Sequence, residues 1–468
     1  MTKTNICRCL KVLVFSGLLL LCFRYFFRVF GWKDATGGDF GEDTVRHFYE
    51  TEDNVIDVIF YGSSHCYCTV NQAVLWENTG IAGFNFATGC SHLGNTYYYM
   101  KESLKTQHPK VMAVEVFYTT EATYGVVGNA YRNVLDMDWS GEYIDNAEYT
   151  KQSSDVPVAS LAEMLLKAPI IHTRYRDLSE SDFRDKQFYG RGNYIFWKVN
   201  ENAEIPEALN VDTVGELSEE TIYWLDKIVE LADNEQIDLV FWVSPYLITE
   251  DEAKIFNAVE EYAKAKNVDF INFNHMTRKI DFDYTTDMID RGHVNVSGSN
   301  KVTHWLGFYL QDKYNLPSHL QEEQYHLWEL NAEAWRHKVN NHKMQEIQNL
   351  EEFLCAVPTE GYSVVVMAAE ENIEWLYGSY GGYQISPDNS YQGIWLWVDG
   401  RKQASDKECL ELDLNEYTAM TVRDGVVNIA GQKLYVPQKG VRVIVFDNLL
   451  DEWVDNVFCS DMRQIIER

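Results

Sequence analysis

Residues 55–312 show two alternating hydrophobic patterns. Short apolar runs rich in Val, Ile, Phe and Tyr are separated by longer stretches in which apolar residues recur every three or four positions. The first pattern is typical of buried strands and the second of amphipathic helices. Strands are expected at VIDVIFYG (55–62), GFNFATG (83–89), KVMAVEVFY (110–118), IDLVFWVSPY (237–246) and VDFINF (268–273), and helices at NTYYYMKESLKTQ (95–107), SEETIYWLDKIVELADNEQ (218–236) and TEDEAKIFNAVEEYAKAKN (249–267). Strands that alternate with helices predict an α/β fold, in which a parallel sheet carries helices on both faces.

The pattern changes after residue 315. Residues 316–352 are charged and carry a helical pattern, so we expect them to form a linker. Between residues 353 and 468, short runs such as YSVVVMAA and GVRVIVFD are separated by Asp-Gly and Gly turn signals. These signals favour a small β-rich domain. With residues 45–315 as the α/β domain, the sequence predicts two folded domains behind an N-terminal segment.

Residues 1–33 form a basic, apolar leader. They contain six Lys and Arg residues, no acidic residue, and the uncharged run VLVFSGLLLLCF (12–23). This run alone is too short to cross a bilayer, but 12–32 reaches the ~20 residues required if Arg24 and Arg28 snorkel toward the headgroups. No clear small-x-small cleavage site follows. We therefore expect an uncleaved signal anchor, with a cleaved signal peptide as the alternative.

Charge and cysteine spacing narrow the set of partners. The chain has 40 Lys and Arg against 71 Asp and Glu, and only 34 of the basic residues follow the leader. This acidic excess would repel phosphate backbones, so nucleic acid is not an expected partner. Positive charge flanks both ends of the leader and does not fix its orientation, but the acidic bulk favours an extracytoplasmic domain. The nine cysteines lack paired CxxC spacing, so no metal site is expected.

The stretch DVIFYGSSHC (57–66) places two serines at the end of the first predicted strand. In parallel α/β sheets, reactive groups gather at the carboxyl ends of strands, where helix N-termini offer free N–H donors. Ser64 is therefore a candidate nucleophile. A Gly-Ser-Ser turn is also a common helix cap, and the stretch by itself is more typical of such a cap.

A serine nucleophile needs a base, and TTDMIDRGHVNVSGSNKVTHWLGFYL (285–310) contains one. Asp290 and His293 lie three residues apart in a loop before a helix that we expect to be capped at Ser297. This spacing lets the carboxylate orient the imidazole from the same loop. Together with Ser64, the two residues would form a Ser-His-Asp triad. The alternative is a helix-entry loop with a surface Asp and a hydrogen-bonded His.

Together, GSSH (62–65) and DRGH (290–293) resemble the SGNH, or GDSL-type, hydrolase superfamily. The likeness is closer to its membrane-anchored bacterial branch, which includes teichoic-acid D-alanylation proteins and polysaccharide O-acetyltransferases, because GHVNVSGSNKVTHWLGFYL (292–310) is similar to the HLNxxGxxKxTxYLGxYL ending seen there. The resemblance covers about residues 50–315. It implies a flavodoxin-like sheet, no cofactor, and a triad in which Ser64 is the nucleophile, His293 the base and Asp290 its orienting carboxylate.

The sequence departs from the family pattern at two places. Gly-Asp-Ser is here Gly62-Ser63-Ser64, which the anchored branch tolerates. No Gly-x-Asn-Asp block follows the third strand, where VEVFYTT (114–120) stands instead, so the usual asparagine donor of the oxyanion hole is missing. The Ser64 amide and Gly89 are the expected remaining donors. Losing one such donor typically costs ~100- to 1000-fold in rate.

Two further residues are candidates for substrate binding. His65 directly follows the candidate nucleophile, and Tyr246 ends a strand on the predicted reactive edge, where an aromatic ring is suited to stack on a sugar. Packing or hydrogen bonding inside the protein is the alternative for both.

The stretch KGVRVIVFDNLLDEWVDNVFCSD (439–461) resembles the closing motif of ILEI/PANDER-like domains. This β-rich fold is also appended to bacterial cell-surface glycan proteins, and the resemblance covers about residues 360–462. It implies binding or assembly and assigns no reaction. A purely structural cap on the first domain is the alternative.

The sequence therefore predicts a membrane-anchored, extracytoplasmic SGNH-type serine enzyme, an O-acyltransferase or esterase that acts on cell-surface polysaccharide. By family analogy, a membrane-bound O-acyltransferase that supplies the acyl group is a candidate partner. A different class stays open, namely a catalytically silent glycan-binding or assembly protein of the cell envelope. The missing asparagine block favours that alternative, and the intact Ser64, Asp290 and His293 oppose it.

Overall fold

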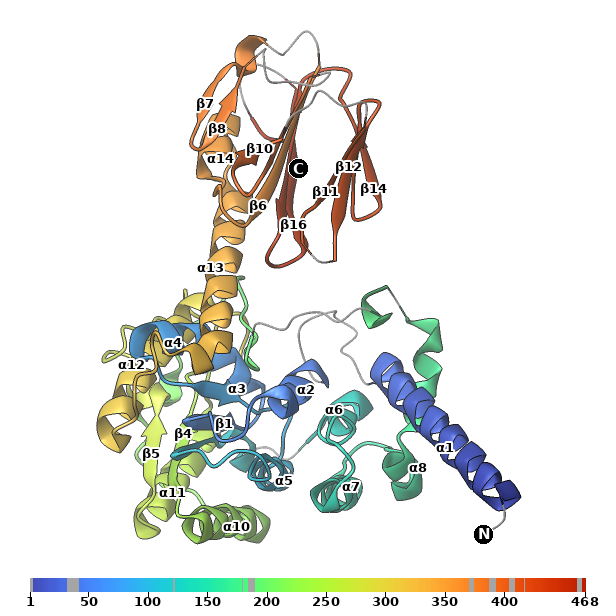
Figure 1. The fold of residues 1–468 in the computed structure, drawn as a ribbon. Coiled ribbons are helices and arrows are strands. Elements are labelled where there is room, and N and C mark those ends of the chain that lie inside the picture. Colours follow the sequence, from blue (N-terminus) through green and yellow to red (C-terminus); the bar gives the residue numbers. More distant parts are fainter. Residues whose placement is uncertain are drawn as a thin grey trace. The chain divides into compact units, whose positions relative to one another are not determined.

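The computed structural model describes residues 3–31, 42–120, 123–178, 180–183, 190–369, 374–386, 393–403, 409–415, 417–460 and 465–468. The chain divides into two compact units, residues 1–332 and 333–468 (Figure 1). Within the described residues, the first unit has one sheet and one large hydrophobic core, and the second has three sheets and two smaller cores.

A parallel five-stranded sheet of order β2-β1-β3-β4-β5 forms the centre of the first unit. Its strands are β1 (Val58–Tyr61), β2 (Gly83–Asn85), β3 (Val111–Glu115), β4 (Asp238–Val243) and β5 (Asp269–Asn272). Every residue of the first three strands is buried, as expected for a parallel sheet that is covered on both faces. This order is flavodoxin-like, and ligands of such sheets bind at the carboxyl ends of the strands.

Helices cover both faces of this sheet (Figure 1). On one face α4 (Gln72–Thr79) packs against α12 (Val296–Tyr314), where Gly307 leaves room for Leu75 and Thr79. On the other face α5 (Leu93–Ser103) packs against α10 (Glu219–Glu235) through tyrosine and tryptophan rings. The predicted parallel α/β fold with helices on both faces is confirmed.

Further helices connect these elements. They are α2 (Glu42–Glu50), α3 (Ser64–Thr69), α6 (Val127–Arg132), α7 (Gly141–Ser153), α8 (Leu161–Leu166), α9 (Ala168–Ile171) and α11 (Glu250–Ala265), with 3-10 turns η1 (Phe117–Thr119), η2 (His172–Arg176), η3 (Glu180–Phe183), η4 (Glu207–Asn210), η5 (Phe273–His275) and η6 (Glu323–Tyr325).

Helix α1 (Lys3–Phe30) precedes the sheet domain. Its segment Leu10–Phe30, 21 residues with a mean hydropathy of 1.9, is long and apolar enough to cross a membrane. The apolar side chains from Leu10 to Phe23 are exposed, with Leu13 and Leu20 at 68% and 69%, whereas Val29 near the end of the helix is buried. By length and composition, α1 fits a single membrane span.

The second unit is mainly antiparallel β-structure. It contains the larger part of α13 (His326–Glu346), α14 (Leu350–Ala356), and sheets of order β10-β9-β6-β15-β16, β11-β12-β13-β14 and β7-β8. The strands are β6 (Tyr362–Ala368), β7 (Gly378–Tyr380), β8 (Tyr383–Ile385), β9 (Ile394–Val398), β10 (Arg401–Lys402), β11 (Cys409–Asp413), β12 (Ala419–Arg423), β13 (Val426–Ile429), β14 (Gln432–Tyr435), β15 (Val441–Asp447) and β16 (Glu452–Cys459), with a 3-10 turn η8 (Glu374–Leu376).

Alternation along β6 explains how this unit is layered. Successive side chains of a strand point to opposite faces. Val364 and Val366 therefore join a core that includes Phe353 of α14, whereas Val365 joins a second core that includes residues of the four-stranded sheet. The five-stranded sheet is thus covered on both faces, and the predicted β-rich C-terminal region is confirmed.

Candidate active site

Ser64 is the first residue of α3 and stands at the carboxyl end of β1. The preceding Ser63 is the helix N-cap, and its Oγ accepts the N–H of His65 at 3.2 Å. Ser63 is fully buried, whereas Ser64 is partly exposed. The two readings of the Gly-Ser-Ser turn therefore apply to different serines: Ser63 caps the helix and Ser64 presents its hydroxyl.

Gly62 allows this turn to lie against β3. Its φ is +137°, a backbone conformation that favours glycine, and a Cβ at this position would lie 2.8 Å from the Cβ of Glu115. A larger residue would push the turn away from the sheet. Because Ser64 follows two residues later, Gly62 helps to fix the position of its hydroxyl.

His293 and Asp290 lie far from Ser64 in the sequence but close to it in the structure. The Ser64 Oγ lies 2.8 Å from His293 Nε2, and His293 Nδ1 lies 3.0 Å from each Asp290 carboxylate oxygen. An ionised carboxylate only accepts hydrogen bonds, so Nδ1 carries the proton and Nε2 is left to accept from Ser64. A serine, imidazole and carboxylate in this order can activate the hydroxyl for attack on an acyl carbon.

Asp290 is held by its own loop. Its Oδ1 also accepts the backbone N–H groups of Gly292 and His293, at 2.7 and 2.8 Å. Partial burial alone would raise the pKa of Asp290, but the His293 ring and these two amides outweigh it and lower the pKa to about 2. Asp290 is therefore ionised throughout the physiological pH range.

The loop closes on itself before α12 begins. Met288 and Val294 form an antiparallel bridge, and the Ile289 N–H donates to the His293 carbonyl. The helix cap is Asn295 and not Ser297, so that expectation was wrong. The Asn295 Oδ1 accepts the N–H groups of Ser297 and Gly298, which starts the helix two residues earlier.

Helices α3 and α12 are fastened together next to the candidate triad. The hydroxyls of Ser299 and Thr303 on α12 donate to the carbonyl of Thr69, the last residue of α3, at 3.0 and 3.1 Å. Ser64 begins α3 and His293 directly precedes α12. The two hydrogen bonds therefore help to keep Ser64 and His293 next to each other, although these residues are 229 positions apart in the sequence.

Glu115, at the end of β3, was not selected from the sequence. Its Oε2 accepts the Ser63 hydroxyl at 2.8 Å, and its Oε1 accepts the Phe117 N–H at 2.6 Å. Complete burial raises the pKa of Glu115 to about 7, although these hydrogen bonds lower it in part. The Glu115 carboxyl group thus contacts the residue that directly precedes the candidate nucleophile. Glu115 ends the strand after which the asparagine block was expected.

The structure places His65 and Tyr246 against each other. The His65 ring stacks on Phe117 at 3.9 Å between centroids, lies 5.2 Å from the Tyr246 ring and 5.3 Å from the His293 ring. Burial lowers the pKa of His65 well below its usual value, so the ring is neutral. Tyr246 is 1% exposed. In this conformation Tyr246 supports His65 and does not offer an open stacking face.

Gly89 lies in the loop after β2, which runs beside the serine turn. The Thr88 N–H donates to the Gly62 carbonyl at 3.2 Å, and the Gly89 carbonyl accepts from Asn133 Nδ2 at 2.9 Å. Gly89 is buried, and a Cβ there would meet Tyr67 and Arg132 at 3.4 Å. The loop thus adjoins the serine turn, but no described interaction joins Gly89 to Ser64.

Phe196 is a second residue that the sequence did not single out. Its ring lies 6.3 Å from the His293 ring, and its carbonyl accepts the Val296 N–H. It belongs to the irregular segment before η4, where the aromatic stretch NYIFWKV (193–199) is the one available sequence signal. Across the described residues, no three His, Cys, Asp or Glu side chains converge in a way that would hold a metal ion.

Comparisons with known proteins give only distant matches. No family model matches the chain, and no curated protein matches it. Among solved structures, it is similar to a Desulfitobacterium hafniense DCB-2 protein named as a lipolytic member of the G-D-S-L family, with 13% identity over 54% of this chain and 97% of the other and a TM-score of 0.28.

Two further structures match at a similar level. One is a gut microbial diltiazem-metabolizing enzyme, with 12% identity, coverage of 56% of this chain and 47% of the other, and a TM-score of 0.29. The other is a Bacteroides fragilis NCTC 9343 protein named as an acylhydrolase, with 11% identity, coverage of 61% and 98%, and a TM-score of 0.27. Similarity at these scores assigns no function to this chain.

Proposed function

We propose that this chain is a membrane-anchored, SGNH-type serine enzyme that transfers or hydrolyses acyl groups on cell-surface polysaccharide. The observation that carries the proposal is the hydrogen-bonded series Asp290, His293 and Ser64, with Nδ1 to carboxylate at 3.0 Å and Nε2 to Oγ at 2.8 Å. The resemblance of GSSH and DRGH to the SGNH superfamily and the flavodoxin-like sheet support it.

The chemistry follows from the positions of the protons. His293 Nε2 takes the proton of Ser64 as Oγ attacks the acyl carbonyl, and it then gives this proton to the leaving oxygen, which produces an acyl-enzyme. A polysaccharide hydroxyl or water next donates its proton to His293 and attacks the acyl carbon. Ser64 recovers its proton when the ester bond to the enzyme breaks. Asp290 stays ionised and keeps the imidazole proton on Nδ1.

The oxyanion of the tetrahedral intermediate needs N–H donors. We assign this role to the backbone amides of Ser64, at the N-terminus of α3, and of Gly89 in the neighbouring loop. His65 is assigned to substrate contact because it follows Ser64 and lies beside His293. Tyr246 contributes through its contact with His65.

Location and partners are part of the same proposal. Helix α1 would anchor the chain, with the acidic bulk outside the cytoplasm, and a membrane-bound O-acyltransferase would supply the acyl group. The C-terminal unit, which resembles ILEI/PANDER-like domains in sequence, would bind glycan or aid assembly. The acyl-transfer preference over hydrolysis comes from the family resemblance.

The second candidate function is a silent glycan-binding or assembly protein. The observation in its favour is Glu115, because a buried carboxylate accepts hydrogen bonds where an active family member would offer an asparagine donor. A site with fewer oxyanion donors would be slow or inactive.

Active-site labelling separates the two candidates. A fluorophosphonate probe should label the purified wild-type chain and leave Ser64→Ala unlabelled. The control is Ser63→Ala, which changes the neighbouring serine but keeps the nucleophile, and it should still be labelled. Absent labelling of a folded wild-type chain, together with normal O-acyl content of the surface polysaccharide in a stably expressed Ser64→Ala strain without a redundant paralogue, would refute the enzyme and favour the binding protein.

Topology is tested on intact spheroplasts. Protease should digest the region after residue 34 and spare the short N-terminus, because the acidic bulk favours the extracytoplasmic side. Full protection of the large domain, with digestion after detergent is added, would reverse the orientation and remove cell-surface polysaccharide as substrate.

A further inference from the structure

One face of α1 lies against the first unit at the end of the candidate membrane span. Phe23, Phe27 and Gly31 line a cavity together with residues of the sheet domain, and their four-residue spacing places them on one helix face. The Phe27 ring meets Trp139 edge-on at 4.8 Å, and Arg174 of η2 donates to the carbonyls of Val29 and Gly31. The domain is therefore attached directly to the last turns of the helix.

This attachment sets the depth of the domain in a bilayer. The cavity-lining stretch of α1 begins at Leu20, and from there to Gly31 the helix rises roughly 16 Å, about half of the ~30 Å hydrocarbon core. If Leu10–Phe30 crosses the membrane, the domain residues that touch this stretch lie within one leaflet and its headgroup layer. Trp139 and Leu166 are 54% and 62% exposed there, as expected for side chains at a lipid interface.

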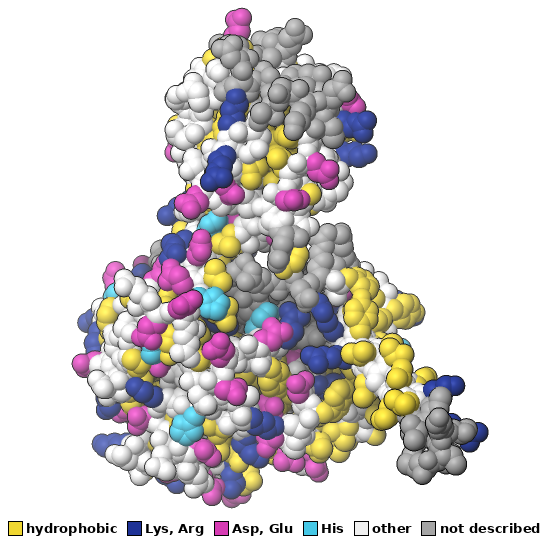
Figure 2. All heavy atoms as spheres, viewed as in Figure 1, with side chains coloured by type: hydrophobic (Ala, Val, Ile, Leu, Met, Phe, Trp, Pro, Cys, Tyr) yellow, Lys and Arg dark blue, Asp and Glu magenta, His cyan; other side chains and the backbone are white. Residues whose placement is uncertain are grey.

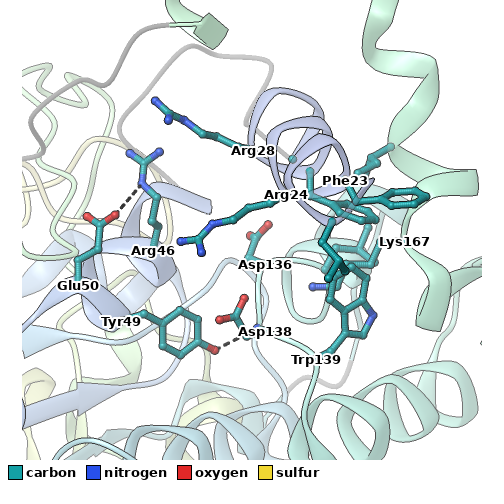
Figure 3. Close-up of a pocket in the computed structure, with 15 residues that line it drawn as sticks. Phe23, Arg24, Arg28, Arg46, Tyr49, Glu50, Asp136, Asp138, Trp139 and Lys167 are labelled. Carbon is teal, nitrogen blue, oxygen red and sulfur yellow. Dashed lines mark hydrogen bonds and ion pairs between the residues drawn. The ribbon is translucent and has the colours of Figure 1, made fainter. Parts of the chain in front are cut away.

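The cavity at this attachment is lined by both charged and apolar side chains and has a volume of about 860 Å³, within the usual range for ligand sites. Arg24 and Arg28 extend from α1 toward Arg46 of α2, and Asp136 and Asp138 lie near Arg24 (Figure 3). Lys167 also lines the cavity. Among the described residues, four cationic side chains and three carboxylates, Glu50, Asp136 and Asp138, thus line the cavity, and Arg46 lies 3.9 Å from Glu50. The lining keeps a formal excess of one positive charge, although the whole chain has a net charge of −31. Guanidinium groups suit phosphate oxygens because they donate paired hydrogen bonds.

A second cavity of about 430 Å³, which is apolar, adjoins the first one. Both cavities are lined by Phe23, Phe27 and Trp139, and the apolar one continues over Leu165, Leu166 and Pro169. Figure 2 shows hydrophobic side chains gathered around α1 and α8, with Lys and Arg side chains next to them. The joined cavities thus carry charged side chains, with cations in slight excess, on one side of a shared aromatic wall and apolar side chains on the other.

We propose that these cavities bind a phospholipid of the membrane that α1 crosses, with the headgroup phosphate among Arg24, Arg28 and Arg46 and an acyl chain along the Phe23, Phe27 and Leu166 wall. A bilayer lipid is favoured because the site is continuous with the candidate span and because a half with an excess of cations adjoins an apolar half. The proposal depends on α1 lying in a membrane and is independent of the acyl-transfer chemistry.

Retained lipid is the direct measurement. The full-length chain is reconstituted in vesicles of phosphatidylglycerol and phosphatidylcholine, extracted in mild detergent, and examined by native mass spectrometry for phospholipid bound to the protein. Arg24→Gln with Arg28→Gln should lower retention about tenfold or more, since charge-assisted hydrogen bonds are lost. The matched control, Arg8→Gln with Lys11→Gln, removes the same charge from exposed positions of the same helix and should retain lipid as the wild type does.

Further variants and controls complete the test. Arg24→Lys with Arg28→Lys should recover part of the retention, and thermal unfolding identifies any variant that fails to fold. Leu166→Ser should also lower retention, whereas Val126→Ser, 59% exposed and away from both cavities, should not. Equal retention in the glutamine variants and the wild type overturns the proposal. Displacement of the lipid by millimolar inorganic phosphate would show a free-anion site and overturns it as well.

Discussion

Ser63 and Ser64 are neighbours in one turn, and each is connected to a different carboxyl group. The two carboxyl groups differ in exposure and in pKa. Asp290 reaches Ser64 through His293, is half exposed, and has a pKa of about 2. Glu115 binds Ser63 directly, is fully buried, and has a pKa of about 7. The difference arises because Asp290 faces an imidazole and two amides near water, while Glu115 faces neutral donors inside the protein.

The difference in pKa indicates that one carboxyl group is suited to catalysis and the other to holding the turn in place. A carboxylate that must stabilise a positive imidazole is useful only when it is ionised near neutral pH. A carboxyl that holds a buried turn need not be ionised, and burial without a cation makes ionisation costly. The Asp290 loop is therefore the catalytic candidate, and Glu115 is the residue that positions Ser63 and, through it, the start of α3.

The largest effect is expected at Asp290. Asp290→Asn should fold normally but lower acyl-enzyme formation by ~1000- to 10,000-fold, because an amide can favour the wrong imidazole tautomer. The rate of fluorophosphonate labelling measures this loss. The control Asp251→Asn removes the same charge from a side chain of α11 that is 95% exposed, and it should label at the wild-type rate. Equal rates in both variants would contradict the role given to Asp290.

An intermediate effect is expected at Glu115, and it depends on pH. The folded chain holds the Glu115 proton up to a pKa of about 7, whereas the unfolded chain releases it near 4.5, the ordinary pKa of a glutamic acid side chain. The folded state thus binds more protons between these values, and wild-type stability falls as pH rises through this window, by roughly 3 kcal/mol in total. Glu115→Gln should lack this fall because it cannot ionise.

Urea unfolding at several pH values between 4.5 and 8 would measure the difference between the two chains. Ser63→Ala provides a second check of the sign. The Ser63 hydroxyl lowers the pKa of Glu115, so its removal should move the pH window upward. Parallel stability curves for wild type and Glu115→Gln would contradict the raised pKa.

The parts of the fold that follow from local pattern were predicted from the sequence. The five strands of the first unit lie within the expected apolar runs, because a strand buried on both faces needs continuous apolar side chains. Long amphipathic helices such as α10 and α11 were found for the same kind of reason. Short helices such as α6 and α8 were missed, since six residues are too few to show a helical period.

In the candidate site, too, some residues could be predicted from the sequence and others could not. Ser64, His293 and Asp290 stood in recognisable motifs at strand and helix ends, and the structure brings their side chains together. Glu115 could not be found from the sequence, because its contact with Ser63 depends on the positive φ of Gly62 and the register of β1 beside β3. The cap at Asn295 was missed because Asn and Ser are equally good caps, and the Asn295 N–H bond to the Asp287 carbonyl decides between them.

The smallest effect is expected at Arg291, the residue next to Asp290. Its Nη2 donates to both oxygens of Glu252 on α11 at 2.9 Å, but the Arg291 side chain is 59% exposed. The backbone bond from the Leu247 N–H to the Arg291 carbonyl does not need the side chain. Arg291→Gln should therefore cost ~1 kcal/mol or less, and the cost should shrink in high salt.

Labelling of Ser64 by the probe should change by only a few-fold in Arg291→Gln, since the Asp290 contacts with His293 stay in place. The control is Lys254→Gln, which breaks an exposed ion pair with Glu250 on the same helix without touching the loop. If Arg291→Gln lowers labelling as far as Asp290→Asn does, the loop is held from α11 and not by its own hydrogen bonds. The contrast between a self-supporting Asp290 loop and a Glu115 that depends on the surrounding fold would then fail.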